Sequence, residues 1–249
     1  MKINRTAMRT VEILELVASS EQDLTLGDIS TQLQIPKTST FDILETLVHL
    51  NMLYIKEQRL KTYAIGVKAY VIGNNYSKTS LLLNSSTAII KDLSEKTGQA
   101  VLVAKEDSGK VIYTLKQDPT KKVIATPEIG DLDYLHATSS GKAILAYSAD
   151  QQQLLRDLSL PQCTEKSITS LVQLKAELFD IRTDGYAVSD REKEDYLYAI
   201  AAPIFDYNGV VSAAVELVCL YQEGYDPAPH IKAVKKAARE ISKLLGYDR

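Results

Sequence analysis

One short stretch in the first third of the chain carries four consecutive side chains that can donate hydrogen bonds. Lys37, Thr38, Ser39 and Thr40 fall in the first turn of a predicted helix, where small or flexible donors suit entry into the DNA major groove. Ile35 is a poor N-cap, so the first backbone amides of this helix are free to bind an anion such as phosphate. This pattern favours a DNA-reading helix.

Other basic residues could support the same chemistry. Arg59 and Lys61 lie in a predicted hairpin turn that could reach the flanking backbone or the minor groove, and Arg5 and Arg9 could add phosphate contacts. Residues 1–65 contain seven Lys or Arg against eight Asp or Glu, so bulk charge does not argue for DNA. On residue types alone, a solvated helix start and a charged hairpin tip remain an equal alternative.

A second anion-binding pattern lies in the middle of the chain. Ser139, Ser140 and Gly141 open a predicted helix, and the orphan amides and dipole there favour a negatively charged group such as a carboxylate. A nucleotide phosphate loop would need glycine in place of His136 and Ser or Thr in place of Ala143. The sequence therefore predicts a small-anion site and excludes a triphosphate loop.

Three predicted helices followed by a hairpin position the donor-rich stretch from Lys37 to Thr40. This order of elements is that of a winged helix-turn-helix. Thr25 and Asp28 form a capping-box pattern that opens the second helix, and Pro36 suits the first position of the third. Apolar residues recur at helical spacing in the first and third helices. We expect helices over 6–19, from about 26 and from Pro36, strands over 54–56 and 62–65, and a linking helix over 67–76.

The remainder of the chain alternates strands and helices, which predicts a mainly antiparallel sheet with helices and an α+β fold class. Asn208 and Gly209 join two strand patterns and are a strong hairpin signal. We expect strands over 100–104, 111–115, 122–126, 186–188, 197–205 and 210–220, and helices over 82–97, 139–147, 150–158, 171–183 and 227–245.

Composition narrows the class of protein. The net charge is −3, and no apolar run approaches the ~20 residues that a membrane helix needs. Cys163 and Cys219 are too few for a disulfide framework, and the three histidines lack metal-ligand spacing. We therefore expect a cytoplasmic protein with no metal, no cofactor, no catalytic residue and no membrane partner.

Several blocks of sequence together resemble the IclR family of bacterial transcriptional regulators, and their order and spacing cover nearly the whole chain. The blocks are Ile35-Pro36-Lys37-Thr38-Ser39-Thr40, Asn51-Met52-Leu53, Thr62-Tyr63-Ala64-Ile65-Gly66, His136 to Ala146, Gly185-Tyr186-Ala187-Val188 with Glu192, and Ile200-Ala201-Ala202-Pro203-Ile204.

The resemblance implies a domain order and a function. It implies a winged-helix DNA-binding domain over 1–66, a linker helix over 67–83 and a GAF-like effector-binding domain over 84–249. It also implies homodimers or homotetramers that bind palindromic operators in double-stranded DNA. Repression of a catabolic operon, relieved by a small carboxylate effector such as a sugar acid, is the expected function, and activation remains open.

The same resemblance points to effector-binding residues. Family members hold effector carboxylates at the turn formed by Ser139, Ser140 and Gly141. Glu216 replaces a small polar residue on a strand facing the pocket, which suggests a hydroxyl-rich or amine-bearing effector. Its alternative position is an edge strand pointing to solvent. The remaining candidates for the pocket are Ser189, Ala199, Val218, Tyr134, Tyr186 and Tyr198.

One departure from the family lies in the reading helix itself. Asp42 stands where many members carry arginine, and a carboxylate can accept a hydrogen bond from a cytosine amine but cannot hold a phosphate. We therefore expect an unusual operator. Two other classes remain open. One is an enzyme of GAF-like fold fused to a DNA-binding module. The other is a partner-binding module whose wing contacts protein, which the acidic residues Asp28, Asp42 and Glu45 around the reading helix leave possible.

Overall fold

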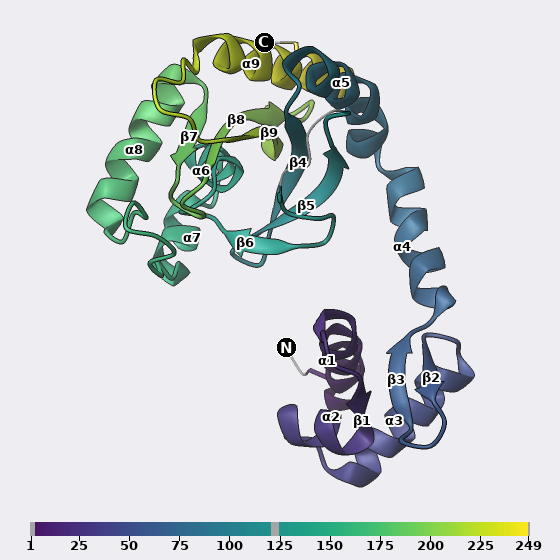
Figure 1. Cartoon of the computed structure of the whole chain (residues 1–249). Coiled ribbons are helices and arrows are strands. Elements are labelled where there is room, and N and C mark those ends of the chain that lie inside the picture. The colour runs from purple at the N-terminus through teal and green to yellow at the C-terminus, as the bar shows by residue number, and fades with distance from the viewer. Residues whose placement is uncertain (1–2, 121–124, 249) are drawn as a thin grey trace. The chain divides into compact units, whose positions relative to one another are not determined.

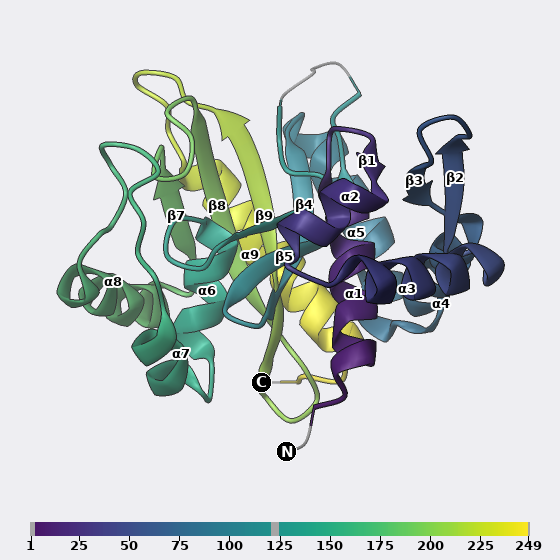
Figure 2. The same ribbon diagram turned by 90° about the horizontal axis from the view of Figure 1, so that it is seen from below.

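The chain forms two compact units, one up to Thr79 and the other from Ser80 onward. They are seen in a computed structural model that describes residues 3–120 and 125–248 (Figure 1). Figure 2 gives a second view of the same elements. Each unit has its own buried apolar core. The proposed division into a domain, a linker and a second domain stays a prediction, although helix α4 belongs to the first unit.

The first unit is a winged helix-turn-helix. Three helices pack around a core that includes Ile13, Ile29 and Leu44, all fully buried. A three-stranded antiparallel sheet in the order β1-β3-β2 completes it, and β2 and β3 form the wing. The elements are α1 (Arg5–Ser19), β1 (Leu24–Thr25), α2 (Leu26–Gln32), α3 (Lys37–His49), β2 (Leu53–Glu57), β3 (Thr62–Ile65) and α4 (Val67–Thr79).

Local sequence signals explain most of these boundaries. The Asn4 side chain caps α1, and Thr25 and Asp28 form the predicted capping box at the start of α2. Helix α3 begins one residue later than expected, because Pro36 is its N-cap rather than its first residue. The two-residue strand β1 was not predicted, since it is defined by pairing with β3 and not by a strand pattern of its own.

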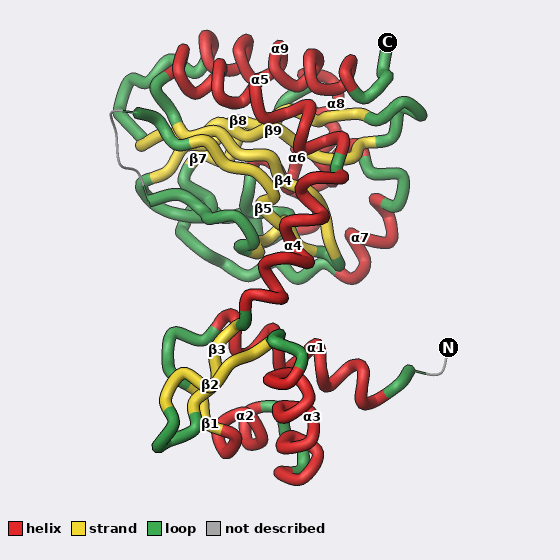
Figure 3. The backbone as a smooth tube through the Cα atoms, turned by 90° about the vertical axis from the view of Figure 1, so that its right-hand side faces the viewer, coloured by secondary structure: helices red, strands yellow, loops and turns green. Residues whose placement is uncertain are grey.

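The second unit is an α+β sandwich around a six-stranded antiparallel sheet in the order β6-β5-β4-β9-β8-β7. Helices α5 and α9 cover one face, and Figure 3 shows them side by side above the strands. Helices α6, α7 and α8 pack against the other face. The elements are α5 (Leu81–Thr97), β4 (Ala100–Asp107), β5 (Lys110–Gln117), β6 (Leu132–Tyr134), α6 (Ser139–Tyr147), α7 (Gln151–Asp157), α8 (Leu171–Asp184), β7 (Ala187–Asp190), β8 (Leu197–Phe205), β9 (Val211–Leu220) and α9 (Ala228–Leu244).

The sheet differs from the expected one at its β5 edge. The predicted strand over 122–126 lies mostly outside the described residues, and Ala125 and Thr126 belong to no strand. The described edge strand is β6, which pairs with β5 and was not predicted from its three residues. Strand β9, in contrast, lies between β4 and β8 and is central. Every second side chain of β9 therefore faces α6, which decides what Glu216 can contact.

Candidate functional site

The start of helix α3 presents an open hydrogen-bonding surface. Its N-cap Pro36 has no side chain that can accept from the first amides, and no side-chain cap is formed. Lys37, Thr38 and Asp42 are exposed on this helix, and Ser39 is half-buried. An uncapped helix start that carries a lysine can bind a phosphate, and the neighbouring side chains can reach base edges.

Thr40 does not belong to this surface, although the sequence placed it there. Its side chain is fully buried, and its hydroxyl donates to the Pro36 carbonyl at 3.2 Å. The hydroxyl therefore satisfies the backbone that leads into α3 and cannot contact DNA. The reason is helical periodicity, because Thr40 lies on the same side of α3 as the buried Ile43, Leu44 and Leu47.

The wing carries the second group of basic residues. Arg59 and Lys61 are exposed in the turn between β2 and β3. The Glu57 carboxylate accepts from the backbone amides of residues 59 and 60, at 3.0 and 3.1 Å, and so holds this turn in shape. Lys56 is different, since it pairs with Asp23 at 2.6 Å. The wing thus offers Arg59 and Lys61 to a ligand and uses Lys56 within the fold.

Arg5 and Arg9 lie on helix α1 of the same unit. Arg5 is the first residue of α1 and is exposed, whereas Arg9, one turn further along, is half-buried. Arg5 can therefore add a phosphate contact at the start of α1, and Arg9 has less freedom to do so.

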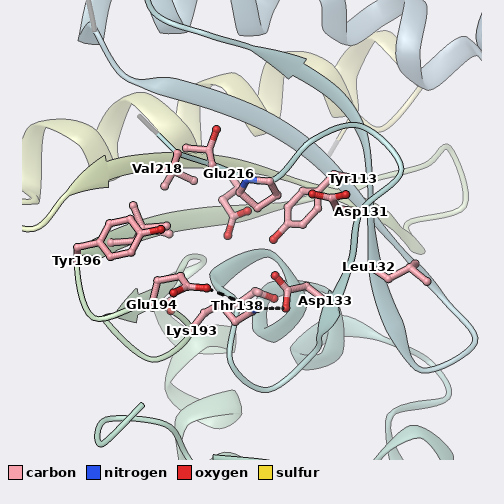
Figure 4. Close-up of a pocket in the computed structure, with 16 residues that line it drawn as sticks. Tyr113, Asp131, Leu132, Asp133, Thr138, Lys193, Glu194, Tyr196, Glu216 and Val218 are labelled. Carbon is pink, nitrogen blue, oxygen red and sulfur yellow. Dashed lines mark ion pairs between the residues drawn. The ribbon is translucent and has the colours of Figure 1, made fainter. Parts of the chain in front are cut away.

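A cavity of about 350 Å³ in the second unit lies between the sheet and the loops that surround the start of α6 (Figure 4). Apolar side chains and charged groups share its walls. Its described lining residues are Tyr113, Ala125, Thr126, Pro127, Asp131, Leu132, Asp133, Thr138, Ser189, Lys193, Glu194, Tyr196, Leu197, Ala199, Glu216 and Val218. A cavity of this size accommodates a small organic molecule.

The turn at the start of α6 already holds a carboxylate, and that carboxylate belongs to the protein. The Ser139 hydroxyl donates to Glu216 Oε1 at 2.5 Å, and the Ser140 amide donates to the same oxygen at 3.1 Å. The Gly141 amide donates to the N-cap side chain of Thr138. Two of the donors that the sequence assigned to an effector carboxylate are therefore engaged by Glu216, and the Gly141 amide is engaged by Thr138.

Strand alternation explains this position of Glu216. Residues 214, 216 and 218 of β9 face α6, while residues 215 and 217 pack beneath α5 and α9. Because β9 is a central strand, Glu216 has no route to solvent on an edge and is 2% exposed. The solvent-facing alternative is thus excluded.

The second oxygen of this carboxylate is unusual. Among the described residues, Glu216 Oε2 has no hydrogen-bond partner although it is buried, and the same holds for the Ser140 hydroxyl. Burial raises the pKa of Glu216, while hydrogen bonds from Ser139 and Ser140 oppose that rise. The pKa of Tyr113 is also raised, chiefly by burial and then by the negative field of Glu216. Figure 4 shows the Glu216 carboxyl and the Tyr113 hydroxyl directed toward the same space.

The structure divides the other predicted effector residues into two groups. Ser189, Ala199 and Val218 line the cavity, and the Ser189 hydroxyl donates to the Ala137 carbonyl at 2.8 Å. Tyr186 and Tyr198 pack with the α5 and α9 layer on the opposite face of the sheet. These two tyrosines cannot wall the cavity, because they fall on the other phase of the strand alternation.

Tyr134 also lies away from the cavity. It is on strand β6, and the Lys110 ammonium stacks over its ring at 3.7 Å from the centroid. Its neighbour Asp133 faces the cavity instead and pairs with Lys193 at 3.1 Å. Asp133 and Lys193 were not predicted as cavity residues. Strand β6 and the loop before β8 carry no local sequence pattern that indicates which way their side chains point.

A buried ion-pair cluster lies behind the α6 turn. The Lys142 ammonium is fully buried and binds both the Glu192 carboxylate, at 2.7 Å, and that of Glu177 on α8. Burial raises the pKa of Glu192 to about 7, and Lys142 limits that rise. Glu192 precedes Lys193 and Glu194 of the cavity wall, so this cluster ties α6 and α8 to the loop that closes the cavity.

The described part of the chain contains neither a candidate metal cluster nor a candidate membrane span. No group of three or more His, Cys, Asp or Glu residues there could hold a metal ion. None of the helices in residues 3–120 and 125–248 is long and apolar enough to cross a bilayer.

A winged helix-turn-helix followed by a separate α+β unit is typical of a DNA-binding transcriptional regulator. Two family models match the chain. The model of the IclR helix-turn-helix domain matches residues 6–55, and that of the bacterial transcriptional regulator IclR C-terminal domain matches residues 75–243. The chain therefore belongs to the IclR family of DNA-binding regulators. This finding confirms the resemblance and the α+β fold class.

Individual relatives agree with this assignment. The chain is 27% identical to the transcriptional regulator BhcR of Paracoccus denitrificans, over 96% of this chain and 86% of that protein. It is 28% identical to the transcriptional repressor IclR of Escherichia coli, over 84% and 77%. These relatives are transcriptional regulators, which argues against the fused-enzyme alternative.

Solved structures share the fold. An IclR regulator from Alicyclobacillus acidocaldarius matches with a TM-score of 0.87 at 22% identity, covering 98% of this chain and 100% of that one. An IclR homologue from Microbacterium hydrocarbonoxydans, solved with 4-hydroxybenzoate, matches with a TM-score of 0.83 at 20% identity, covering 96% and 98%. At these identities the matches establish the fold alone.

Proposed function

We propose that this regulator reads its operator with helix α3 and contacts the flanking backbone with the wing. The observation that carries this proposal is the uncapped start of α3, with Lys37 and Thr38 exposed beside it. Free amides and a lysine provide phosphate contacts, and Asp42 adds an acceptor for a base-edge amine. The exposed Arg59 of the wing supplies a further phosphate contact.

The operator is palindromic and the regulator is a homodimer or a pair of dimers in this proposal. Helix α4 supports it, because none of its thirteen residues is buried within the chain. Val67, Tyr70 and Val71 recur at helical spacing, and each is more than half exposed. An apolar helical stripe of this kind favours association with a second copy, and a two-fold dimer favours a palindromic site.

The cavity beside α6 is the proposed effector site, and its occupant controls operator affinity. The solved homologue with 4-hydroxybenzoate shows that this fold can hold a small organic acid. We retain repression of a catabolic operon as the expected sense of regulation, in line with relatives that are named repressors. Effector binding would act by changing the spacing of paired winged helices through residues 67–83.

The test of the reading surface is a gel-shift series over several salt concentrations. DNA from upstream of the regulator's own gene serves as the probe. Lys37→Ala is expected to weaken binding about tenfold and to lower the salt slope by about one unit, because one phosphate contact is lost. Lys56→Ala is the matched control, since Lys56 already pairs with Asp23. Equal effects of the two substitutions, or none from Lys37→Ala, would contradict the proposal.

A further inference from the structure

The effector cavity contains a buried acceptor that the fold itself leaves unsatisfied. Glu216 is 2% exposed, and one of its oxygens accepts from Ser139 and Ser140. The other, Oε2, has no partner among the described residues, and Glu216 lines the cavity. A buried carboxylate oxygen without a hydrogen-bond partner destabilises the protein. A ligand that donates a hydrogen bond to this oxygen removes that cost, and its binding is strengthened accordingly.

The same carboxylate opposes an acidic ligand. It occupies the turn at the start of α6, where it accepts from the Ser139 hydroxyl and the Ser140 backbone amide. A ligand carboxylate would have to displace Glu216 from these donors, or lie against a like charge in a poorly solvated space. The site in this chain has therefore lost the anion-binding capacity that its helix start would otherwise supply.

The other charged side chains of the cavity also disfavour an anionic ligand. Among its described lining residues are four carboxylates, those of Asp131, Asp133, Glu194 and Glu216, and one ammonium, that of Lys193. Lys193 is already paired with Asp133 at 3.1 Å and lies 3.9 Å from Glu194. Figure 4 shows Glu194, Lys193 and Asp133 across the cavity from Glu216. No unpaired cation remains among the described lining residues to receive a ligand's negative charge.

We propose that the effector of this regulator is a small organic ammonium compound whose N–H groups bind Glu216 Oε2. The inference rests on the proposed role of the cavity as the effector site. Tyr113 and Tyr196 line the same cavity and place aromatic rings near a bound cation, while Leu197, Ala199 and Val218 can cover its carbon skeleton. A neutral polyol would donate hydrogen bonds but would leave the buried charge of Glu216 uncompensated.

The experiment separates ligand classes before the effector itself is identified. A small-molecule extract of the host cell is divided on ion-exchange resins into cationic, anionic and neutral fractions. Each fraction is added to the full-length regulator, and both its melting temperature and its affinity for the upstream DNA are measured. The cationic fraction alone is expected to raise the melting temperature and change DNA affinity.

Variants locate the effect at Glu216. The active compound, purified from the cationic fraction, is titrated calorimetrically. Glu216→Gln is expected to weaken its binding about 30-fold, the value of one charge-assisted hydrogen bond. The amide keeps an oxygen for Ser139 and Ser140, so unchanged DNA binding by the empty variant verifies its fold. Glu194→Gln removes a more exposed charge from the same cavity and is expected to change binding less than about threefold.

Each other outcome overturns the inference. Activity in the anionic fraction would mean that Glu216 binds in its protonated form and donates to an acid, which keeps the cavity as an effector site but reverses the ligand class. Activity in the neutral fraction would contradict an ion pair between the ligand and Glu216. Equal losses of ligand affinity in the Glu216→Gln and Glu194→Gln variants would contradict it as well. If the regulator binds DNA but no fraction and not even the whole extract acts, effector control itself fails.

Discussion

The two candidate sites of this regulator, the winged helix and the cavity beside α6, differ in how their charged side chains are held. On the winged helix, Lys37, Arg59 and Lys61 are exposed and are held by few contacts within the fold. Around the cavity, Lys142 and Glu216 are almost completely buried and are tied to partners from distant segments. Exposed charges can be exchanged with little effect on stability, whereas buried charges are part of the structure that they serve.

Among the substitutions that test this difference, the largest loss of stability is expected at Lys142. Replacing it by methionine leaves the carboxylates of Glu177 and Glu192 facing each other without a cation. We expect the second unit to lose about 3–5 kcal/mol of unfolding free energy, while the winged helix unfolds as before. Calorimetry on the full chain measures both transitions.

An exposed ion pair provides the control for Lys142. Lys96 pairs with Asp92 on the surface of α5, so Lys96→Met is expected to leave the unfolding of the second unit almost unchanged. A loss in Lys142→Met as small as that in Lys96→Met would contradict the view that the buried cluster holds the cavity wall.

Two helical glycines test the tight packing of the α6 turn. A Cβ on Gly141 would lie 2.5 Å from the Leu135 carbonyl oxygen and 2.6 Å from its Cα, whereas nothing lies within 4 Å of a Cβ on Gly73. We expect Gly141→Ala to cost about 1–3 kcal/mol, because backbone must move. Gly73→Ala should stabilise helix α4 by up to about 1 kcal/mol. Urea unfolding at one protein concentration measures both, and similar values would contradict the packing described for α6.

The specificity of the reading helix is tested at Asp42. We expect Asp42→Ala to relax the preference at one base-pair position by about 1–3 kcal/mol, with the other positions and the fold unaffected. Competition binding with every single-base variant of the operator measures this profile. Glu45→Ala, one turn further along the exposed side, is the control. An unchanged profile for Asp42→Ala would remove Asp42 from the base contacts.

A graded effect that depends on pH is expected from Glu192. Its pKa rises from 4.5 to about 7 on folding, so the folded state holds this proton over a range in which the unfolded state has lost it. Its contribution to stability is therefore full below about pH 4.5 and disappears as the pH rises to about 7. Relative to Glu192→Gln, the wild type should lose about 2–3 kcal/mol of unfolding free energy between about pH 5 and 8. A constant difference across this range would contradict the raised pKa.

The same contrast explains what the sequence could predict. The winged helix follows from local signals, such as the cap at Thr25 and the apolar spacing of α1 and α3. Eight of the nine residues predicted to contact DNA are at least partly exposed. Thr40 was the exception, because the donor-rich first turn of α3 has one side that faces the core. Helical periodicity would have assigned it correctly.

The cavity depends on contacts that no local pattern records. Glu216 and Ser139 are 77 residues apart, and their hydrogen bond exists only because β9 is placed centrally and in phase with α6. The family resemblance predicted Glu216 and Ser189 as cavity residues, and both line the cavity. It also suggested Tyr186 and Tyr198, which lie on the opposite face of the sheet. Lys193 and Asp133 meet only after β6 joins the sheet edge, so their pairing could not be read from either segment.

The most direct test of the central claim is a footprint on the DNA upstream of the regulator's own gene, with full-length protein and with or without the host's small-molecule extract. We expect a two-fold symmetric protected region at physiological salt, and a marked change in the protein concentration needed for protection when extract is added. Absence of protection, or protection that the extract leaves unchanged, would contradict a DNA-binding regulator controlled through the cavity beside α6.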